Sequence, residues 1–220
     1  MSAIDLATLR QIVRFRGDYQ NVRKFPDADL DREIQGAFGE FYELVADTNE
    51  GWWDASAQVT TVSGQDYVAL PADAWRVHGI DLLDSGDWVE LLQVGRADRN
   101  RFGTDTDEPE AYRLTARGID LMPTPNAVYT LRVTYTPTAP ALQEAQPREW
   151  YNGWDEYVVT AALLRLDQRE QRPVNERVGI LDRLKQRVIA GASRRRGQEP
   201  DYLPLREGWS DLSPRDRGVF

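Results

Sequence analysis

A chain of 220 residues, 41% of them hydrophobic and 29% charged, can bury a sizeable core as one domain or as two small ones. It has no cysteine, which excludes disulfides, thiolate metal sites and cysteine nucleophiles. Its net charge of −9 opposes the phosphate backbone, so we expect no specific nucleic-acid binding. No stretch reaches the roughly 20 apolar residues of a membrane span, and no secretory signal opens the chain, so we expect no membrane partner.

Two helices are predicted at the N-terminal end. The first is short and amphipathic, from about residue 4 to residue 16, with Leu6, Leu9, Ile12 and Val13 at helical spacing. The second begins after Pro26, with Asp27 as its predicted N-cap, and ends at Asn49 and Gly51. Its apolar residues recur every three or four positions: Leu30, Ile34, Ala37, Phe38, Phe41, Tyr42 and Val45.

The pattern then changes to the two-residue period of β-strands. Short segments rich in β-branched and aromatic residues predict strands at Gln58–Ser63, Gln65–Leu70, Trp75–Leu83, Trp88–Val94, Ala111–Thr115, Gly118–Met122 and Val128–Thr136. Hairpin turns are expected at Ser85–Gly86–Asp87 and at Arg117–Gly118. Several short strands at this spacing favour a small antiparallel sandwich or barrel.

Helical spacing returns after a proline-bearing linker, Pro137 to Pro147. Pro173 separates two C-terminal helices, which we expect to form an antiparallel hairpin. The second carries the stripe Val174, Val178, Leu181, Leu184 and Val188. The predicted fold class is therefore α+β. A helical bundle formed by the N- and C-terminal helices (1–51 and 148–197) has an inserted antiparallel β-sandwich or barrel module (52–147) and an extended C-terminal tail (198–220).

A search for chemistry finds no active site. His78 is the only histidine, and no serine, histidine and aspartate set can be proposed around it. The acidic run Asp105–Glu108 lacks the glycine and alternating oxygen ligands of a calcium loop, so a solvated loop is favoured over a cation site. Asp81, Asp84 and Asp87 flank a turn, where aspartate is common for local reasons. We therefore expect no enzyme, no cofactor and no metal.

Two motifs have more than one interpretation. Trp52–Trp53 fits either a sugar-binding platform or packing between the helical and β parts, and packing is favoured. Arg194–Arg195–Arg196 could contact nucleic acid, but the overall acidity favours the helix dipole or a carboxylate partner, such as a neighbouring subunit. Arginine far outnumbers lysine, which indicates protein–protein contacts or a genomic base composition, and the residues do not decide between the two.

The order of motifs resembles the head-to-tail adaptors of tailed phages, the portal-binding connectors also called tail tubular or neck proteins. LRQIVRFRGDYQN and FPDADLDREIQGAFGEFYELV are similar to the family's first two helices. YVALPADAWRVHGIDLL, from Tyr67, resembles its strand signature. Pro109–Tyr112, Gly118–Pro125 and Leu131–Leu142 are similar to its later strand ends and exit linker.

The resemblance implies a structural protein of the virion neck, made in the bacterial cytoplasm. It implies a ring, commonly of twelve copies, that docks on the portal protein, lets DNA pass without binding it specifically, and carries a downstream tail or neck protein. The alternative is a carbohydrate- or protein-binding β module on a helical stalk, with Trp52, Trp53 and Trp88 as platforms.

The C-terminal tail has no counterpart in the resemblance. Its prolines hold it extended, and its apolar and cationic residues are spaced as anchors. We expect it to dock on the portal or a neighbouring subunit through Tyr202, Leu203, Pro204, Arg206, Trp209, Arg215, Arg217 and Phe220. The rival interpretation is that the tail folds back on its own subunit.

Overall fold

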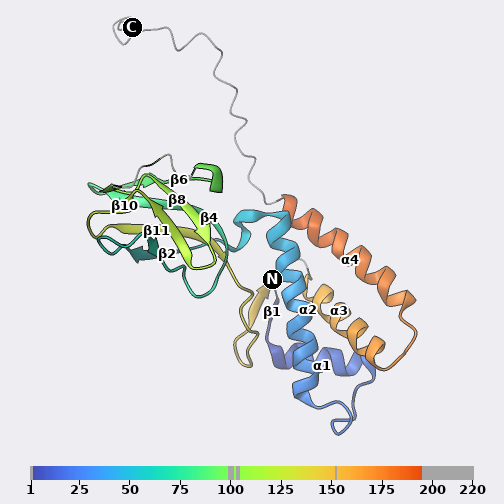
Figure 1. The fold of residues 1–220 in the computed structure, drawn as a ribbon. Coiled ribbons are helices and arrows are strands. Elements are labelled where there is room, and N and C mark those ends of the chain that lie inside the picture. Colours follow the sequence, from blue (N-terminus) through green and yellow to red (C-terminus); the bar gives the residue numbers. More distant parts are fainter. Residues whose placement is uncertain (1, 99–101, 103–104, 152, 195–220) are drawn as a thin grey trace, which may run out of the picture.

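The computed structural model describes residues 2–98, 102, 105–151 and 153–194 (Figure 1). Its α-helices are α1 (Leu6–Gly17), α2 (Asp27–Thr48), α3 (Asp155–Arg169) and α4 (Asn175–Arg194). Its strands are β1 (Ser2–Ile4), β2 (Ala55–Thr60), β3 (Tyr67–Val68), β4 (Ala74–Asp84), β5 (Asp87–Glu90), β6 (Leu92–Gln93), β7 (Thr106–Asp107), β8 (Ala111–Thr115), β9 (Gly118–Met122), β10 (Thr124–Pro125), β11 (Thr130–Pro137) and β12 (Arg148–Trp150). Two short 3₁₀ helices are η1 (Glu50–Trp53) and η2 (Arg96–Asp98). Over these ranges, no helix combines the length and apolarity needed to cross a bilayer.

The four helices and the β1–β12 pair, called the helical part below, share one hydrophobic core. All seven apolar residues predicted to face the core from α2 are buried. Asp5 caps α1 by accepting a hydrogen bond from the Thr8 amide, 2.8 Å. Pro26, not Asp27, occupies the N-cap position of α2, so that prediction was wrong. Asp27 instead uses its carboxylate to bind Arg14 on α1.

Strands β2 to β11, called the β part below, have a second core. One sheet has the order β2-β11-β4-β5 and the other has β3-β9-β8-β6, and both contribute side chains to that core. Strands β8 and β9 have the predicted bounds, and β4 differs from its prediction by one residue at each end. The glycine predicted at the β8–β9 turn is required there. Gly118 has a φ of +133°, and a Cβ would lie 2.3 Å from the Val68 carbonyl oxygen.

Several features of the β part differ from the prediction. Strand β2 spans Ala55–Thr60 instead of Gln58–Ser63, and β3 has only two residues, Tyr67–Val68. The segment Trp88–Val94 is not one strand, because the chain leaves the first sheet at Leu91 and enters the second at Leu92. Pairing is also not purely antiparallel: β6 lies parallel to β8, and β10 lies parallel to β7. The mixed α+β class is confirmed. The bundle, the sandwich or barrel, and the division into domains stay predictions.

Helix α4 is less buried than its sequence stripe suggests. Of the five predicted core positions, only Val188 is buried. Ala192, which was not predicted, is buried one turn later. Leu181 and Leu184 are half-buried, and Val178 keeps 40% of its surface exposed. Val174 precedes the helix. Helix α4 therefore covers the helical part with one narrow side and leaves most of its surface to solvent.

An acid-sensitive contact stabilises the β8–β9 hairpin. Asp120 is buried and receives hydrogen bonds from Arg113 (2.8 Å), Arg117 (2.7 Å) and Thr115 (3.1 Å). Burial alone would raise the pKa of Asp120, but these hydrogen bonds outweigh burial and lower the pKa below its ordinary value of 3.8. The contact therefore stabilises the fold above about pH 3.8, and this contribution is lost as the pH falls through the lowered pKa.

We accordingly expect Asp120→Asn to be less stable than the wild type at pH 7, and the difference to narrow as the pH falls toward 3. Urea unfolding of both proteins at several pH values measures this difference. Asp66→Asn is the control, because Asp66 pairs with Arg117 at an exposed position, where an ion pair contributes about 0–1 kcal/mol. A difference that is constant across this pH range would contradict the assignment.

Candidate docking surfaces

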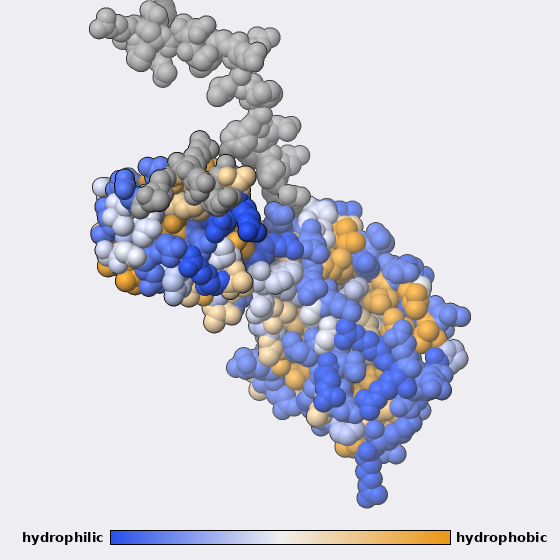
Figure 2. Space-filling model, in the orientation of Figure 1, coloured by the Kyte–Doolittle hydropathy of each residue, from blue (hydrophilic) through white to orange (hydrophobic). Residues whose placement is uncertain are grey.

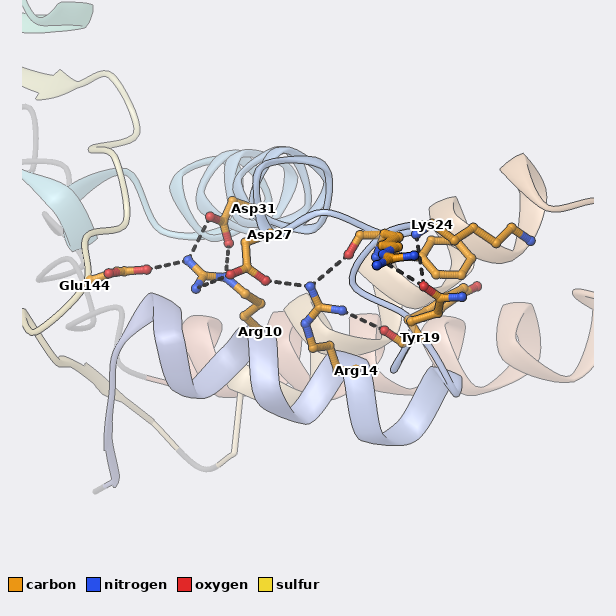
Figure 3. A network of polar contacts seen from close by, with 10 residues as sticks. Arg10, Arg14, Tyr19, Lys24, Asp27, Asp31 and Glu144 are labelled. Carbon is orange, nitrogen blue, oxygen red and sulfur yellow. Dashed lines mark hydrogen bonds and ion pairs between the residues drawn. The ribbon is translucent and has the colours of Figure 1, made fainter.

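An arginine network joins α1 to α2 and to the linker that follows β11 (Figure 3). Arg10 donates hydrogen bonds to Asp31 at 2.7 and 2.8 Å and pairs with Asp27 at 3.5 Å. It also contacts Glu144, which comes after the β part in the chain. Asp31 and Glu144 each favour the charged guanidinium and raise the pKa of Arg10, against the opposing effect of burial. The linker that leaves the β part is thus fixed against the helices.

Next to it, Arg14 orders the connection between α1 and α2. Its guanidinium donates to the carbonyl oxygens of Tyr19 (2.7 Å) and Phe25 (2.8 Å) and to the carboxylate of Asp27. The hydrogen bond from Arg14 lowers the pKa of Asp27. A connection that lacks secondary structure is in this way held in one conformation.

A buried carboxylate joins the same connection to α3 and α4. Asp167 on α3 is 3% exposed and accepts a 2.7 Å hydrogen bond from the Tyr19 hydroxyl. It also forms ion pairs with Arg177, in the first turn of α4, and with Arg172 at 3.8 Å. Burial, and then the bond to Asp167, raise the pKa of Tyr19. This contact fixes the start of α4 relative to α1 and α3.

Aromatic rings from α2, η1 and the N-cap of α3 pack together where the chain passes from α2 into the β part. Tyr42 on α2 stacks on Trp53 with the ring centroids 4.7 Å apart and the planes at 11°. The Tyr42 hydroxyl donates to the Pro137 carbonyl at the end of β11, 3.0 Å, and burial raises the pKa of Tyr42 to about 12. Trp52 lies against Trp154 of the helical core, with centroids 5.1 Å apart. Both rings pack against the helical core, so packing is confirmed over a free sugar-binding platform, although the packing is not between the two parts as predicted.

The third platform candidate is also covered. Trp88 is half-buried, and the Arg132 guanidinium lies over its ring, 4.5 Å from the centroid. Arg132 in turn pairs with Asp81 at 2.8 Å. Asp81 is therefore an ion-pair partner, whereas Asp84 and Asp87 lie exposed at the predicted hairpin turn.

His78 has partners, but their geometry does not suit catalysis. Its Nε2 atom is 2.7 Å from the Thr136 hydroxyl and 3.5 Å from an Asp54 carboxylate oxygen. A relay needs both ring nitrogens, one toward the nucleophile and one toward the acid, but here one nitrogen has both contacts. Thr136 is also 1% exposed, so no substrate could reach its hydroxyl.

The described residues hold no group of three or more histidine, aspartate or glutamate side chains placed for a metal ion. A hollow of about 780 Å³ lies beside β6 and β8. Its lining among the described residues has no acid or histidine to act as a base: Gln93, Val94, Gly95, Arg96, Arg113, Leu114 and Thr115. Among the described residues we find no arrangement of side chains suited to catalysis.

Of the docking residues predicted from the sequence, the structure describes only Arg194. Arg194 lies exposed in the last turn of α4, where a cation suits the helix dipole. Arg195, Arg196 and the whole tail, residues 198–220, lie outside the described residues. The Asp167 contact was not anticipated from the sequence, although Arg172 and Arg177 after α3 are possible partners for a buried acid.

Comparison with known families identifies the chain. A family model described as SU10 adaptor protein matches residues 4–202, which include both the helical and the β part. A search of curated proteins finds no match. The resemblance seen in the sequence is thereby confirmed: the chain belongs to the SU10 adaptor family of phage head-to-tail adaptor proteins.

Proposed function

We propose that the chain assembles as a ring, of about twelve copies, on the portal of a tailed phage, in the neck of the virion. Phage DNA passes through the ring, a downstream tail or neck protein attaches to it, and the role is structural, without catalysis. The observation that carries the proposal is the family match, because it spans residues 4–202 and so includes every described helix. The contacts between α2 and the ends of the β part support it, since a ring requires subunits of one fixed shape.

Electron microscopy of isolated portal rings, with and without the purified chain, tests this function. An additional ring of density with cyclic symmetry is the expected result. If the chain adds no density to the portal at high concentration, the proposed function is wrong. The chain alone provides the second sample, because it determines whether the ring forms without the portal as a template.

We expect the ring to bind DNA only weakly. The net charge of −9 makes the chain repel a phosphate backbone, so DNA can slide through without being retained. Filter binding of double-stranded DNA at low salt should show little retention. Tight binding that falls steeply with added salt would contradict this expectation.

The C-terminal tail is proposed to be a docking arm. Tyr202, Leu203, Trp209 and Phe220 would be buried against the portal or a neighbouring subunit, because aromatic residues contribute much of the energy of interfaces. The arginines of the tail would pair with carboxylates along the path. The tail from residue 203 onward lies beyond the family match.

Removing all residues after Gly197 should leave the melting temperature unchanged and abolish binding to the portal. A docking arm makes its contacts only in the complex with the portal, so its removal does not change the stability of the free subunit. Thermal unfolding and co-sedimentation with portal rings measure the two effects. If the melting temperature instead falls sharply while docking persists, the tail packs on its own subunit and the arm is excluded.

A further inference from the structure

Helix α4 presents an exposed basic face. The helix has five basic and two acidic residues, in a protein with an excess of nine acidic charges. Glu176 occupies the first turn. After it, one side of the helix carries three exposed arginines at helical spacing, Arg183, Arg187 and Arg194. Arg183 and Arg194 form no ion pair within the described part of the chain. Half-buried Ile180 lies on the same side, one turn before Arg183.

The acidic excess lies mostly in the β part. Residues 52–147 contain fourteen aspartate and glutamate residues and seven arginines, which leaves a net charge of −7 of the total of −9. A run of exposed residues on β5, β6 and the end of β4 combines acids with apolar side chains. We call it the β5–β6 edge: Leu83 (37% exposed), Asp84, Asp87, Val89 (48%), Glu90 and Leu92 (54%). Strands β5 and β6 are both the last strands of their sheets.

These two surfaces lie on different sides of the subunit. Figure 1 places the sheets on one side of α2 and α4 on the other. The surface on the α4 side mixes apolar with hydrophilic residues, as Figure 2 shows for the helical part. With the sheets and α4 on opposite sides of α2, the α4 face of one copy can meet the β5–β6 edge of the next. Contacts of this head-to-tail kind produce rings when the rotation between copies closes.

We propose that the basic face of α4 (Arg183, Arg187 and Arg194) docks against the acidic β5–β6 edge (Asp84, Asp87 and Glu90) of a neighbouring copy. This proposal rests on the proposed ring and names the contact that builds it. Opposite charges would fix the register and orientation of the copies. Leu83, Val89 and Leu92 from one copy, and Ile180 from the other, would supply the apolar area that interfaces bury.

The same residues would also suit two different roles. A basic helix could bind DNA, but the apolar Ile180 and the absence of an aromatic residue from α4 favour a protein partner over bases or phosphates. Charges on an edge strand also prevent copies from pairing edge to edge. An arginine on the edge strand would prevent edge-to-edge pairing as well as an aspartate does. Reversing the sign of these charges should therefore disturb docking on α4 but leave protection of the edge unchanged.

Charge reversal of the full-length chain tests the contact. The first variant carries Arg183→Glu and Arg194→Glu, and the second carries Asp87→Arg and Glu90→Arg. Each places like charges across the contact and should weaken self-association on the order of tenfold or more at low salt. A matched control, Arg23→Glu with Arg32→Glu, changes the net charge as the first variant does, at exposed positions away from α4, and should associate like the wild type.

Restoration gives the decisive result. A chain with all four reversals again has opposite charges between the reversed positions and has the net charge of the wild type, so it should assemble again. An equimolar mixture of the two reversed variants should also assemble, as an alternating ring with an even number of copies. Sedimentation velocity of the concentrated chain and electron microscopy on isolated portal rings measure assembly in both settings, and circular dichroism shows that each variant is folded.

The outcomes separate this contact from the ring itself. If the wild type forms rings and both reversed variants do so equally well, the contact is wrong while the proposed function stands. If the wild type forms no ring in either setting, the contact and the proposed function fail together. If the first variant assembles normally but loses binding to double-stranded DNA that the wild type shows, the α4 face is a DNA surface and the contact is overturned.

Discussion

Replacing Asp167 with alanine should lower the free energy of unfolding by about 1–3 kcal/mol, because it removes a buried carboxylate that binds a buried hydroxyl and two partly exposed arginines. Asp167 is 3% exposed and is the acceptor for Tyr19, which is fully buried, and the partner of Arg177 and Arg172. Without the carboxylate, the buried Tyr19 hydroxyl loses its acceptor. Urea unfolding followed by circular dichroism measures the change.

Glu156→Ala is the control for this prediction. It removes the partner of Arg16, and both side chains of that pair are more than a third exposed, so we expect a change of about 0–1 kcal/mol. The double variant with Tyr19→Phe measures the coupling between Tyr19 and Asp167. If Asp167→Ala were no more destabilising than Glu156→Ala, the contact would not hold α4 in place.

Phe38→Ala should also destabilise the helical part by about 3–5 kcal/mol, through the lost burial of the ring and the cavity that remains. Phe38 is fully buried and contacts the rings of Phe41, Tyr42 and Trp150 at centroid distances of 5.8 to 6.2 Å. The Arg148 guanidinium lies over the same ring, 5.0 Å from its centroid. Helix α2 and strand β12 therefore lose contacts together when this side chain is shortened.

The same substitution at Phe15 is the matched control. Phe15 on α1 is 81% exposed, so Phe15→Ala should change the stability by less than about 0.5 kcal/mol. Thermal and urea unfolding of the two variants give the comparison directly. Equal effects at the two positions would show that burial of Phe38 is not what stabilises the helical part.

Local patterns predicted the elements whose burial repeats regularly along the chain. Helix α2 was found because its apolar residues follow the helical period, and Leu131, Val133 and Tyr135 of β11 alternate as expected. The pairing of β1 with β12 was missed, since each strand has three residues and Ser2 pairs with Trp150. No local signal identifies a partner so distant in the sequence. The break at Leu91 was missed for a related reason: the strand pattern continues although the chain changes sheets.

The candidate surfaces were predicted less completely than the elements. The arginines after residue 193 were singled out because three cations follow one another, and Arg194 is indeed exposed. The rest of the α4 face was missed. Its arginines are several residues apart in the sequence, and the prediction assigned a wider side of the helix to the core than is buried. Val178 belonged to the predicted core stripe, yet the helices beneath α4 cover mainly Val188 and Ala192. Which side of a helix is covered depends on its neighbours.

The position of the β part within the chain has a consequence for the order of folding. Residues 49–154 separate α2 from α3, and the helical core is incomplete until α3 is made. Ala55 and Tyr135, near the two ends of the β part, are paired neighbours. Once the sheets form, the flexible chain between α2 and α3 is only roughly a quarter as long as residues 49–154. The shorter loop lowers the entropy cost of docking α3 on α2 by about 1 kcal/mol. During synthesis the sheets emerge before α3, so we expect them to draw the helices together.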